Sequence, residues 1–463
     1  MKTLITIAMA CAIFAPVANA GSGSFTSSDP TLNAIWATGV KTATDMLAPG
    51  GQTFDARGQY CPLPAGETVI LDGTERDRCS YIGDESVIDQ TFDVSTPHFD
   101  IQRKMLEMFA AGQYGNGAIP SSPFRGGLIL FDYCGYWAMV LHNYVLYSGD
   151  LTEGQRMWGH LVRLMNDWYP SQMGPNGLLV NSLGHSDYGF IRRNGTTVAY
   201  YNAQYVYALK QAAELAGWLG HPTYQRKWLE RAQSVSQAFS DFWDPSAGAY
   251  TDTTVDHLTH PEDGNAFAIL AGITTTAQAQ SALAYMSAKE SYSYGNSISD
   301  TQVWDDSAWG DQANMRVYPF IGFYDLLARY NTSGGSASAL NLIRREWGYM
   351  LHNGPQPATD WELIGPYGGA PTDKWPSLDA GWSSGATPAL TQYMLGIQPT
   401  SPGFDTFTVT PHPDGEWFAS GSVVTPKGTI TVAWKVINGK TQISVTSPVG
   451  TKWTNRPPAP RRR

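Results

Sequence analysis

The sequence predicts a mainly α-helical toroid of paired helices, followed by a small antiparallel β-domain. Three observations predict this fold. Apolar residues recur every three or four positions from about residue 26 to 396, as in amphipathic helices. Long loops rich in Gly, Pro and aromatic residues separate these stretches, as expected where loops at one rim form a concave pocket. Beyond Gly396 the helical period gives way to strict alternation. A chain of 463 residues has room for both parts.

The first twenty residues read as a secretory signal peptide. Lys2 precedes the apolar run Leu4–Val17, and Ala18-Asn19-Ala20 is a small-x-small cleavage pattern. The run is too short to span a bilayer comfortably, so a short anchor helix is the less favoured alternative. We therefore expect a secreted, extracellular protein that has no membrane contact after cleavage.

Residues 21–396 are expected to form the helical domain. Asp29-Pro30 combines a capping residue with a proline in the first turn, which predicts a helix start there. The spacing of Tyr205, Leu209 and Ala212 predicts a second clear helix. About ten to twelve helices are expected in all, with further stretches near 86–111, 132–149, 152–169, 224–243, 276–288, 312–329, 337–351 and 383–396.

Residues 397–455 are expected to form a β-sandwich-like domain. Apolar and polar residues alternate over Phe404–Thr410, Thr429–Val436 and Gln442–Thr446. Asn438-Gly439, between the last two runs, is a strong two-residue hairpin signal. The Pro- and Arg-rich residues 456–463 are expected to be a disordered tail.

The composition narrows the class of partner. Asp and Glu exceed Lys and Arg by 40 to 30, and no basic stripe precedes Arg461. Nucleic acid is therefore not expected as a partner, because that affinity comes from neutralising phosphates. Aromatic residues make up 12% of the chain against only 15% charged residues. This balance suits a neutral ligand that stacks on rings.

Three cysteines remain after signal cleavage. In a secreted protein this odd count suggests one disulfide and one buried thiol. The short loop between Cys61 and Cys79 makes them the favoured pair, with Cys134 left free. No CxxC or HExxH spacing is present, so we expect no zinc site.

One short stretch concentrates the charge of the chain. Four acids alternate with two arginines between residues 72 and 84: Asp72, Glu75, Arg76, Asp77, Arg78 and Asp84. Arginines can fix carboxylates through bidentate bonds, and neighbouring carboxylates raise one another's pKa, which suits a general acid. A solvated surface loop with ordinary ion pairs is the alternative.

The same stretch resembles a known signature. The pattern Asp72-Gly73-x-x-Arg76-Asp77-Arg78-x-x-Tyr81-x-Gly83-Asp84 is similar to that of the six-hairpin domain of α-L-rhamnosidases, glycoside hydrolase family 78. Shorter matches follow in the expected order over about residues 30–450. They are Asp132-Tyr133 to Asp150, Asn202-Ala203 to Ala216, Asp263-Gly264-Asn265-Ala266, Ala358-Thr359-Asp360-Trp361-Glu362, Gly381-Trp382-Ser383-Ser384-Gly385 and the hairpin Thr425-Pro426-Lys427-Gly428.

The resemblance implies an (α/α)6 barrel and an inverting, exo-acting hydrolase that releases terminal α-L-rhamnose from plant glycosides or polysaccharides. Asp77 matches the general acid, which protonates the glycosidic oxygen, and Glu362 matches the general base, which activates water on the opposite face. This mechanism requires no cofactor and no metal ion. The partner is a rhamnose-terminated carbohydrate.

The resemblance also implies a set of sugar-binding residues. Asp72, Arg76 and Asp84 match positions that hold hydroxyls or orient Asp77, and Asp187 is a further candidate. Tyr81, Trp137 and Tyr188 match aromatic positions that line the sugar subsite, for which core packing is the general alternative. Trp361 and Trp382 lie within matched motifs and are further candidates. Trp304 belongs to a polar–aromatic loop that is expected to border the pocket.

Three positions depart from the family pattern. Asp77 stands where many relatives have Glu, Tyr81 where many have Trp, and Ala380 where a sugar-binding His is common. The missing His leaves open an inactive carbohydrate-binding relative. A polysaccharide lyase on the same toroid is the second alternative, although the Asp77/Glu362 pair does not suit proton abstraction beside a uronate.

Overall fold

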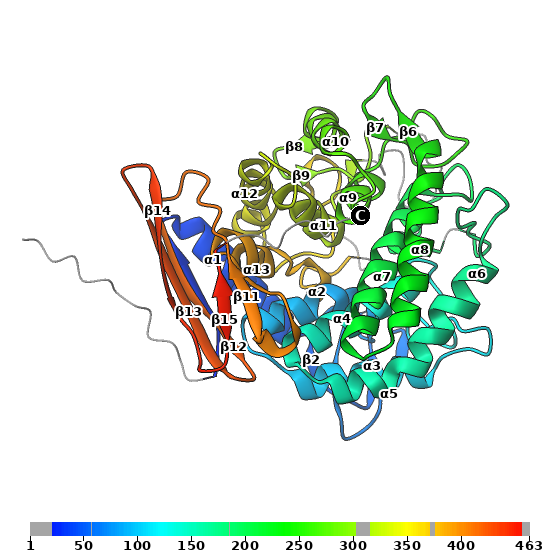
Figure 1. The fold of residues 1–463 in the computed structure, drawn as a ribbon, viewed down its shortest axis with the longest axis horizontal. Coiled ribbons are helices and arrows are strands. Elements are labelled where there is room, and N and C mark those ends of the chain that lie inside the picture. Colours follow the sequence, from blue (N-terminus) through cyan, green and yellow to red (C-terminus); the bar gives the residue numbers. More distant parts are fainter. Residues whose placement is uncertain (1–20, 57, 185, 302–314, 371–375, 456–463) are drawn as a thin grey trace, which may run out of the picture.

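The computed structural model describes residues 21–56, 58–184, 186–301, 315–370 and 376–455. Twelve helices in this part of the chain form six hairpins (Figure 1). Each hairpin is defined here as an outer helix and the inner helix that follows it in the chain: α1 (Pro30–Asp45) and α2 (Ile82–Val94), α3 (Phe99–Ala111) and α4 (Tyr133–Ser148), α5 (Leu151–Arg163) and α7 (Ala199–Trp218), α8 (Pro222–Ala238) and α9 (Glu262–Leu270), α10 (Thr276–Lys289) and α11 (Pro319–Tyr330), and α12 (Ser336–Asn353) and α13 (Ala386–Ala389).

The second helix of each hairpin belongs to an inner ring. Helices α2, α4, α7, α9, α11 and α13 contact one another in that order, and α13 returns to α2. Burial separates the two rings, since α11 buries all 12 of its residues whereas the outer helix α8 buries three of 17. An all-round apolar helix belongs inside a packed core. The predicted (α/α)6 barrel is thereby confirmed.

The connections at the two ends of the ring differ in length. The inner helices begin at one end, which we call the N-terminal mouth, and end at the C-terminal mouth. Long connections enter the N-terminal mouth: 46–81, 112–132, 164–198, 239–261, 290–318 and 354–385. The turns at the C-terminal mouth are 95–98, 149–150, 219–221, 271–275 and 331–335. Functional side chains on loops therefore have room only at the N-terminal mouth.

Aromatic side chains fill the barrel between the two mouths. Tyr136, Phe267, Phe320 and Tyr324 come from α4, α9 and α11, and their ring centroids lie 4.6 to 6.4 Å apart. All four are almost completely buried. Such pairs add to the burial energy by about 0.5–1.5 kcal/mol each. The barrel axis is thus a packed layer.

The β-domain lies beside the barrel, at the left of Figure 1. One antiparallel sheet has the order β1 (Ser24–Ser27), β12 (Phe418–Thr425), β13 (Gly428–Ile437) and β14 (Lys440–Thr446), and the other contains β10 (Ile397–Pro399), β11 (Thr406–Val409) and β15 (Lys452–Thr454). The Asn438-Gly439 turn joins β13 to β14, with both residues in the left-handed region that this hairpin needs.

Two features of the β-domain depart from the prediction. Strand β1 comes from the N-terminal end of the expected helical domain and pairs with β12, and β15 lies parallel to β11. The alternation of a four-residue strand next to a helix start carries too little signal to separate it from a loop. Pairing of β1 ties residues 24–27 to the β-domain.

Further sequence predictions concern a helix boundary, the disulfide and the two ends of the chain. The stretch 86–111 contains two helices, because Pro97 cannot continue α2. Cys61 and Cys79 form the predicted disulfide, and Cys134 is free and buried. The signal peptide 1–20 and the tail 456–463 lie outside the described residues. None of the helices described here is long and apolar enough to cross a membrane.

Candidate active site

Two loops that are far apart in sequence meet at the N-terminal mouth. The loop before α2 pairs with the loop before α13 through a bridge between Gly73 and Ala380. The backbone N–H of Gly381 donates to the carbonyl of Asp72 at 2.8 Å, and that of Thr74 donates to Asp379 at 3.1 Å. This pairing places the acid-rich stretch beside Glu362, as the toroid prediction required.

Arg76 joins the two carboxylates predicted to be catalytic. Its Nη1 contacts Oε1 of Glu362, and its Nη2 lies 3.0 Å from Oδ2 of Asp77. Ser377 holds both partners: its N–H donates to Glu362 Oε2 at 2.7 Å, and its hydroxyl accepts from the Arg76 N–H at 2.9 Å. Asp77 and Glu362 therefore face a common guanidinium group, and both side chains are nearly buried.

Asp77 is held in an uncommon conformation between two cations. Its φ of 45° lies in the left-handed region, which costs a non-glycine residue about 1 kcal/mol or more. The Asp77 N–H donates to the Asp55 carboxylate, and Arg125 Nη2 lies 2.5 Å from Asp77 Oδ1. Guanidinium groups of Arg76 and Arg125 thus both contact the Asp77 carboxylate, so a leaving-group oxygen can reach it only if one of them moves.

Proton-holding carboxyls lie directly behind this pair. Burial raises the pKa of Asp72 well above its usual range, and the charges of Asp84 and Glu362 raise it further. Burial raises the pKa of Asp84 to about 7, against hydrogen bonds from Asp72 and Tyr133. Burial also raises the pKa of Glu362, against the opposing effects of Arg76 and the Ser377 N–H. Asp72, Asp84 and Glu362 therefore keep their protons to higher pH than exposed carboxyl groups do.

Aromatic residues form one wall of the cluster. Tyr81 caps the start of α2, and burial followed by the charge of Asp77 raises its pKa. The Trp382 indole N–H donates to the carbonyl of Glu362 at 2.9 Å, and its ring stacks on Phe320 at 4.9 Å. Tyr188 packs against Phe320 at 5.7 Å, so the wall extends from Trp382 to Tyr188.

Several predicted residues lie apart from this cluster. Trp137 is fully buried in α4, where its indole N–H donates to the Leu106 carbonyl, so it packs the core. Trp361 is also fully buried and packs on Tyr349, away from the carboxylates. Core packing, the general alternative for aromatics, describes both. Trp304 lies outside the described residues.

Asp187 belongs to a second charge cluster at the same mouth. The buried guanidinium of Arg193 contacts Asp187 at 3.0 Å and Asp252 and Asp263 at 2.5 Å each. Asp263 also accepts the Tyr188 hydroxyl at 3.1 Å. Burial alone would lower the pKa of Arg193, but the charges of these three acids have the larger effect and raise its pKa. Asp187 and Tyr188 therefore act together in fixing the loops before α7 and α9.

The residues that the sequence prediction missed are short-range partners of the acids. Arg125 stands in a Gly-rich loop and Ser377 between proline and leucine, and neither belongs to a pattern that predicts a site. The hairpin of β3 (Gln52–Phe54) and β4 (Tyr60–Pro62) was also missed. Its Gln59 accepts from Arg125 Nη1 at 2.6 Å, next to the Asp77 contact.

The acid cluster lines neither of the two cavities described here. The larger, of about 1100 Å³, opens at the C-terminal mouth, and the smaller, of about 120 Å³, lies beside Arg193. The guanidinium groups of Arg76 and Arg125 occupy the space among the carboxylates. Within the described residues, no group of three or more His, Cys, Asp or Glu side chains could hold a metal ion.

Comparisons with known proteins agree with this architecture. A family model described as the bacterial alpha-L-rhamnosidase 6 hairpin glycosidase domain matches residues 66–302, and one described as the bacterial alpha-L-rhamnosidase C-terminal domain matches residues 396–456. The alpha-L-rhamnosidase of Alteromonas sp. (strain LOR) is 29% identical over 126 residues, which cover 24% of this chain and 12% of that protein.

Solved structures share the fold. The GH78 family rhamnosidase of Bacillus sp. GL1 is 20% identical with a TM-score of 0.73, over 95% of this chain and 43% of that one. The rhamnosidase of Klebsiella oxytoca with rhamnose bound is 20% identical with a TM-score of 0.63, over 81% of this chain and 66% of that one. The chain thus spans less than half the length of the Bacillus protein.

Proposed function

Because this chain belongs to the family of bacterial α-L-rhamnosidases built on a six-hairpin glycosidase domain, we propose that it is an exo-acting glycoside hydrolase that removes terminal α-L-rhamnose with inversion. The observation that carries the proposal is the meeting of Asp77 and Glu362 on one guanidinium group, Arg76. An acid and a base on two loops of one mouth suit a bond that must be protonated on one side and attacked by water on the other.

Glu362 takes the role of the base in this proposal. Burial raises the pKa of Glu362, against the opposing effects of Arg76 and the Ser377 N–H, and a raised pKa makes its carboxylate a stronger base toward water. Asp77 takes the role of the acid. Entry of the sugar would have to displace Arg125 from Asp77 Oδ1, so that the glycosidic oxygen can reach this carboxyl group.

The leaving group belongs on the side of the acid, since Asp77 protonates the oxygen of the bond that breaks. The β3–β4 hairpin lies on that side, because Asp55 accepts the Asp77 N–H and Gln59 shares Arg125 with Asp77. It carries two exposed rings, Phe54 and Tyr60, whose centroids are 5.4 Å apart. Exposed rings can stack on a planar aglycone or on the C–H face of a sugar, and we propose that the leaving group of a plant glycoside or polysaccharide contacts them.

Secretion is also proposed for this protein. The signal pattern ending at Ala20 supports it, and so does the Cys61–Cys79 disulfide, since disulfides persist mainly in oxidising compartments. Fractionation of the producing cells, with N-terminal sequencing of the product, tests this: cytoplasmic protein that keeps residues 1–20 would contradict it.

The function is tested by incubating the protein with p-nitrophenyl α-L-rhamnoside and following the released sugar by proton NMR. Initial formation of the β anomer is expected for inversion, and initial formation of the α anomer would replace it with a retaining mechanism. An unsaturated product that absorbs in the ultraviolet would instead indicate a lyase. Rhamnose binding without hydrolysis would indicate a non-catalytic relative, in line with Ala380.

The Asp77→Asn variant tests the acid. Its turnover of methyl α-L-rhamnoside, whose leaving group needs protonation, should fall by about 10²–10⁴-fold, the usual contribution of general acid catalysis, while circular dichroism stays unchanged. Asp405→Asn, at an ion pair on the surface of the β-domain, is the control and should retain full activity. Near-normal turnover of Asp77→Asn would assign the acid to another group.

A further inference from the structure

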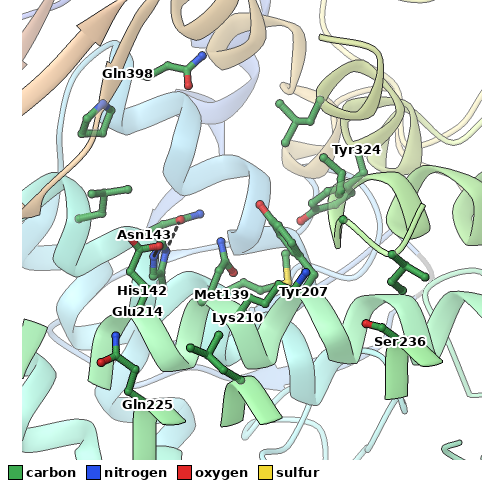
Figure 2. A pocket seen from close by; sticks show the side chains of 18 of the residues that line it. Met139, His142, Asn143, Tyr207, Lys210, Glu214, Gln225, Ser236, Tyr324 and Gln398 are labelled. Atoms are coloured by element: carbon green, nitrogen blue, oxygen red, sulfur yellow. Dashed lines mark hydrogen bonds and ion pairs between the residues drawn. The ribbon is translucent and has the colours of Figure 1, made fainter. Parts of the chain in front are cut away.

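The larger cavity opens at the C-terminal mouth, at the end of the ring opposite the acid cluster. Its volume is about 1100 Å³, and all six inner helices or their direct continuations contribute to its lining. Helix α8 forms one wall along most of its length. Figure 2 shows side chains of α4, α7 and α11 pointing into this space, with Gln398 above them. A cavity of this size exceeds the usual range for a small ligand.

This cavity is separate from the proposed active site. The buried aromatic layer of Tyr136, Phe267 and Phe320 lies across the barrel between the two mouths. The Tyr324 hydroxyl hydrogen-bonds the Ser86 hydroxyl at 2.7 Å and closes the floor of the cavity on its barrel side. A molecule bound here therefore cannot be the same sugar ring that contacts Asp77 and Glu362.

Side-chain amides dominate the polar lining. Each amide offers a donor and an acceptor, which is the pairing that sugar hydroxyls require. Tyr207 and Tyr324 add ring surface and hydroxyls, and Leu229 adds an apolar patch on α8. The amide side chains in the lining include Gln90, Asn143, Gln211, Gln225, Gln233 and Gln392.

One of these amides is held in the wall without a partner. Gln211, on α7, is nine-tenths buried, and its Oε1 has no hydrogen-bond partner among the described residues. A buried amide oxygen left unpaired costs about 1–3 kcal/mol. Gln90 Nε2 donates to the Ser86 carbonyl, and Gln392 Nε2 donates to the Tyr147 hydroxyl, so both amide nitrogens already have a partner within the protein. The cavity thus offers acceptors that a ligand hydroxyl would satisfy.

The charges around the cavity balance. Lys210 and Arg226 offset Glu214 and Glu230, and His142 lies with its Nε2 3.5 Å from Glu214 Oε2. Lys210 also donates to the Ala271 carbonyl. A balanced, amide-rich surface does not select an anion or a cation, and its density of polar groups disfavours an apolar ligand.

We propose that this cavity is a second carbohydrate-binding site that takes a neutral oligosaccharide segment, separate from the site of hydrolysis. Hydroxyls of the segment would pair with Gln211, Gln225 and Gln233, and its C–H faces would lie on Tyr207 and Leu229. Bound here, a polysaccharide would keep the N-terminal mouth close to the side chains of the same polymer and raise their effective concentration.

The test is calorimetric titration of the whole protein with cellohexaose, xylohexaose, maltohexaose and arabinohexaose, in the presence of saturating L-rhamnose. Rhamnose fills the N-terminal mouth under the proposed function, on which this arm rests. The measurement needs no turnover, and the cavity variants described next locate the binding whether or not the protein is a rhamnosidase. We expect at least one hexasaccharide to bind with a stoichiometry of one. Hexagalacturonate, the charged counterpart, should bind more weakly, because its carboxylates lose water on entering a cavity whose charges already balance.

Two variants locate the binding. Gln211→Met keeps the length of the side chain and removes the amide, and Gln233→Ala alters an exposed position on the α8 wall that folding does not need. Each should weaken the hexasaccharide by about fivefold, the cost of one neutral hydrogen bond. Gln280→Met, an exposed glutamine of α10 outside the cavity, is the matched control and should leave binding unchanged. The proposal would be overturned if no neutral hexasaccharide bound, if both cavity variants bound it as tightly as the unchanged protein, or if hexagalacturonate bound more tightly.

Discussion

The two mouths of the barrel use the same six helices in opposite ways. At the N-terminal mouth, connections of up to 36 residues carry the chemistry, and charged groups are packed against one another until little free space remains. At the C-terminal mouth, turns of two to five residues leave the helix ends bare, and a cavity lined by amides lies between them. Loop length alone thus decides whether an end presents loop residues or helix residues.

Helix polarity explains why the acids gather at one mouth. The first turn of a helix carries partial positive charge, which stabilises carboxylates there. Asp84 lies in the first turn of α2, and Glu262 and Asp263 lie in that of α9. The inner helices all begin at the N-terminal mouth, so the ring concentrates this effect at one end. At the C-terminal mouth the ends of the same helices carry partial negative charge, and the charged side chains around the cavity balance.

The largest effect is expected at the proposed base. Glu362→Gln keeps the shape of the side chain and its contact with the Ser377 N–H but removes the proton acceptor. Turnover of p-nitrophenyl α-L-rhamnoside should fall by about 10³-fold or more, within the range of general base catalysis. Steady-state kinetics measures this, with Glu67→Gln as the control, because Glu67 forms only an exposed ion pair with Lys104.

The same variant tests whether the two mouths act independently. Hexasaccharide binding at the C-terminal mouth should be unchanged in Glu362→Gln, since the aromatic layer separates the two sites. A parallel loss of both activities would show that the mouths are coupled through the barrel.

The second effect concerns folding. Asp84 has a pKa of about 7 in the folded chain, raised by burial, against about 3.9 in an unfolded chain. Between these values the folded state binds more protons, so its free energy of unfolding falls as pH rises, by up to about 1.4 kcal/mol per pH unit from this group. Asp84→Asn removes the titrating proton and should flatten the fall between pH 5 and 7 in urea denaturation. The exposed Asp241→Asn is the control; equal slopes in both variants would place the pH sensitivity elsewhere.

Much of this fold could be predicted from sequence because its signals are local and long. Helical periods of 13 to 20 residues, capping at Asp29 and the Asn438-Gly439 turn each predict an element that the structure contains. The order of motifs, from Asp77 to Glu362, likewise indicated that two distant loops share a mouth. The break at Pro97 and the strand β1 were missed because each depends on two to four residues.

The candidate site was predicted only where residues belong to a motif. Asp72, Arg76, Asp77, Tyr81, Asp84, Glu362 and Trp382 meet at one mouth, whereas Arg125 and Ser377 enter by tertiary contact alone. Trp137 is the opposite case, because it belongs to a motif and yet lies in the core, apart from the site. The cavity at the C-terminal mouth had no sequence signal, because its glutamines are spread over several helices.

Arg125 provides the third prediction. It holds Asp77 through a 2.5 Å ion pair and Gln59 through a 2.6 Å hydrogen bond. Arg125→Met should raise kcat/KM for p-nitrophenyl α-L-rhamnoside by about tenfold, the worth of one hydrogen bond to a charged group, because entry of the sugar no longer has to break the contact with Asp77. Arg125→Lys keeps a cation beside Asp77 and is the control. Steady-state kinetics measures the change, and a lower kcat/KM in the Met variant would show that Arg125 supports Asp77 and does not block it.

The smallest expected effect lies at the edge of the N-terminal mouth and tests whether its loops choose the leaving group. The Phe54→Ala/Tyr60→Ala variant removes both exposed rings and should lower kcat/KM for p-nitrophenyl α-L-rhamnoside by about three- to tenfold, the worth of stacking one or two aromatic contacts. The value for methyl α-L-rhamnoside should not change, because a methyl group cannot reach across both rings. Trp417→Ala, which removes an equally exposed ring from the β-domain, should alter neither substrate. Equal losses on the aryl and methyl glycosides would mean that the rings support the hairpin, and the leaving group would then have to be recognised elsewhere on the mouth.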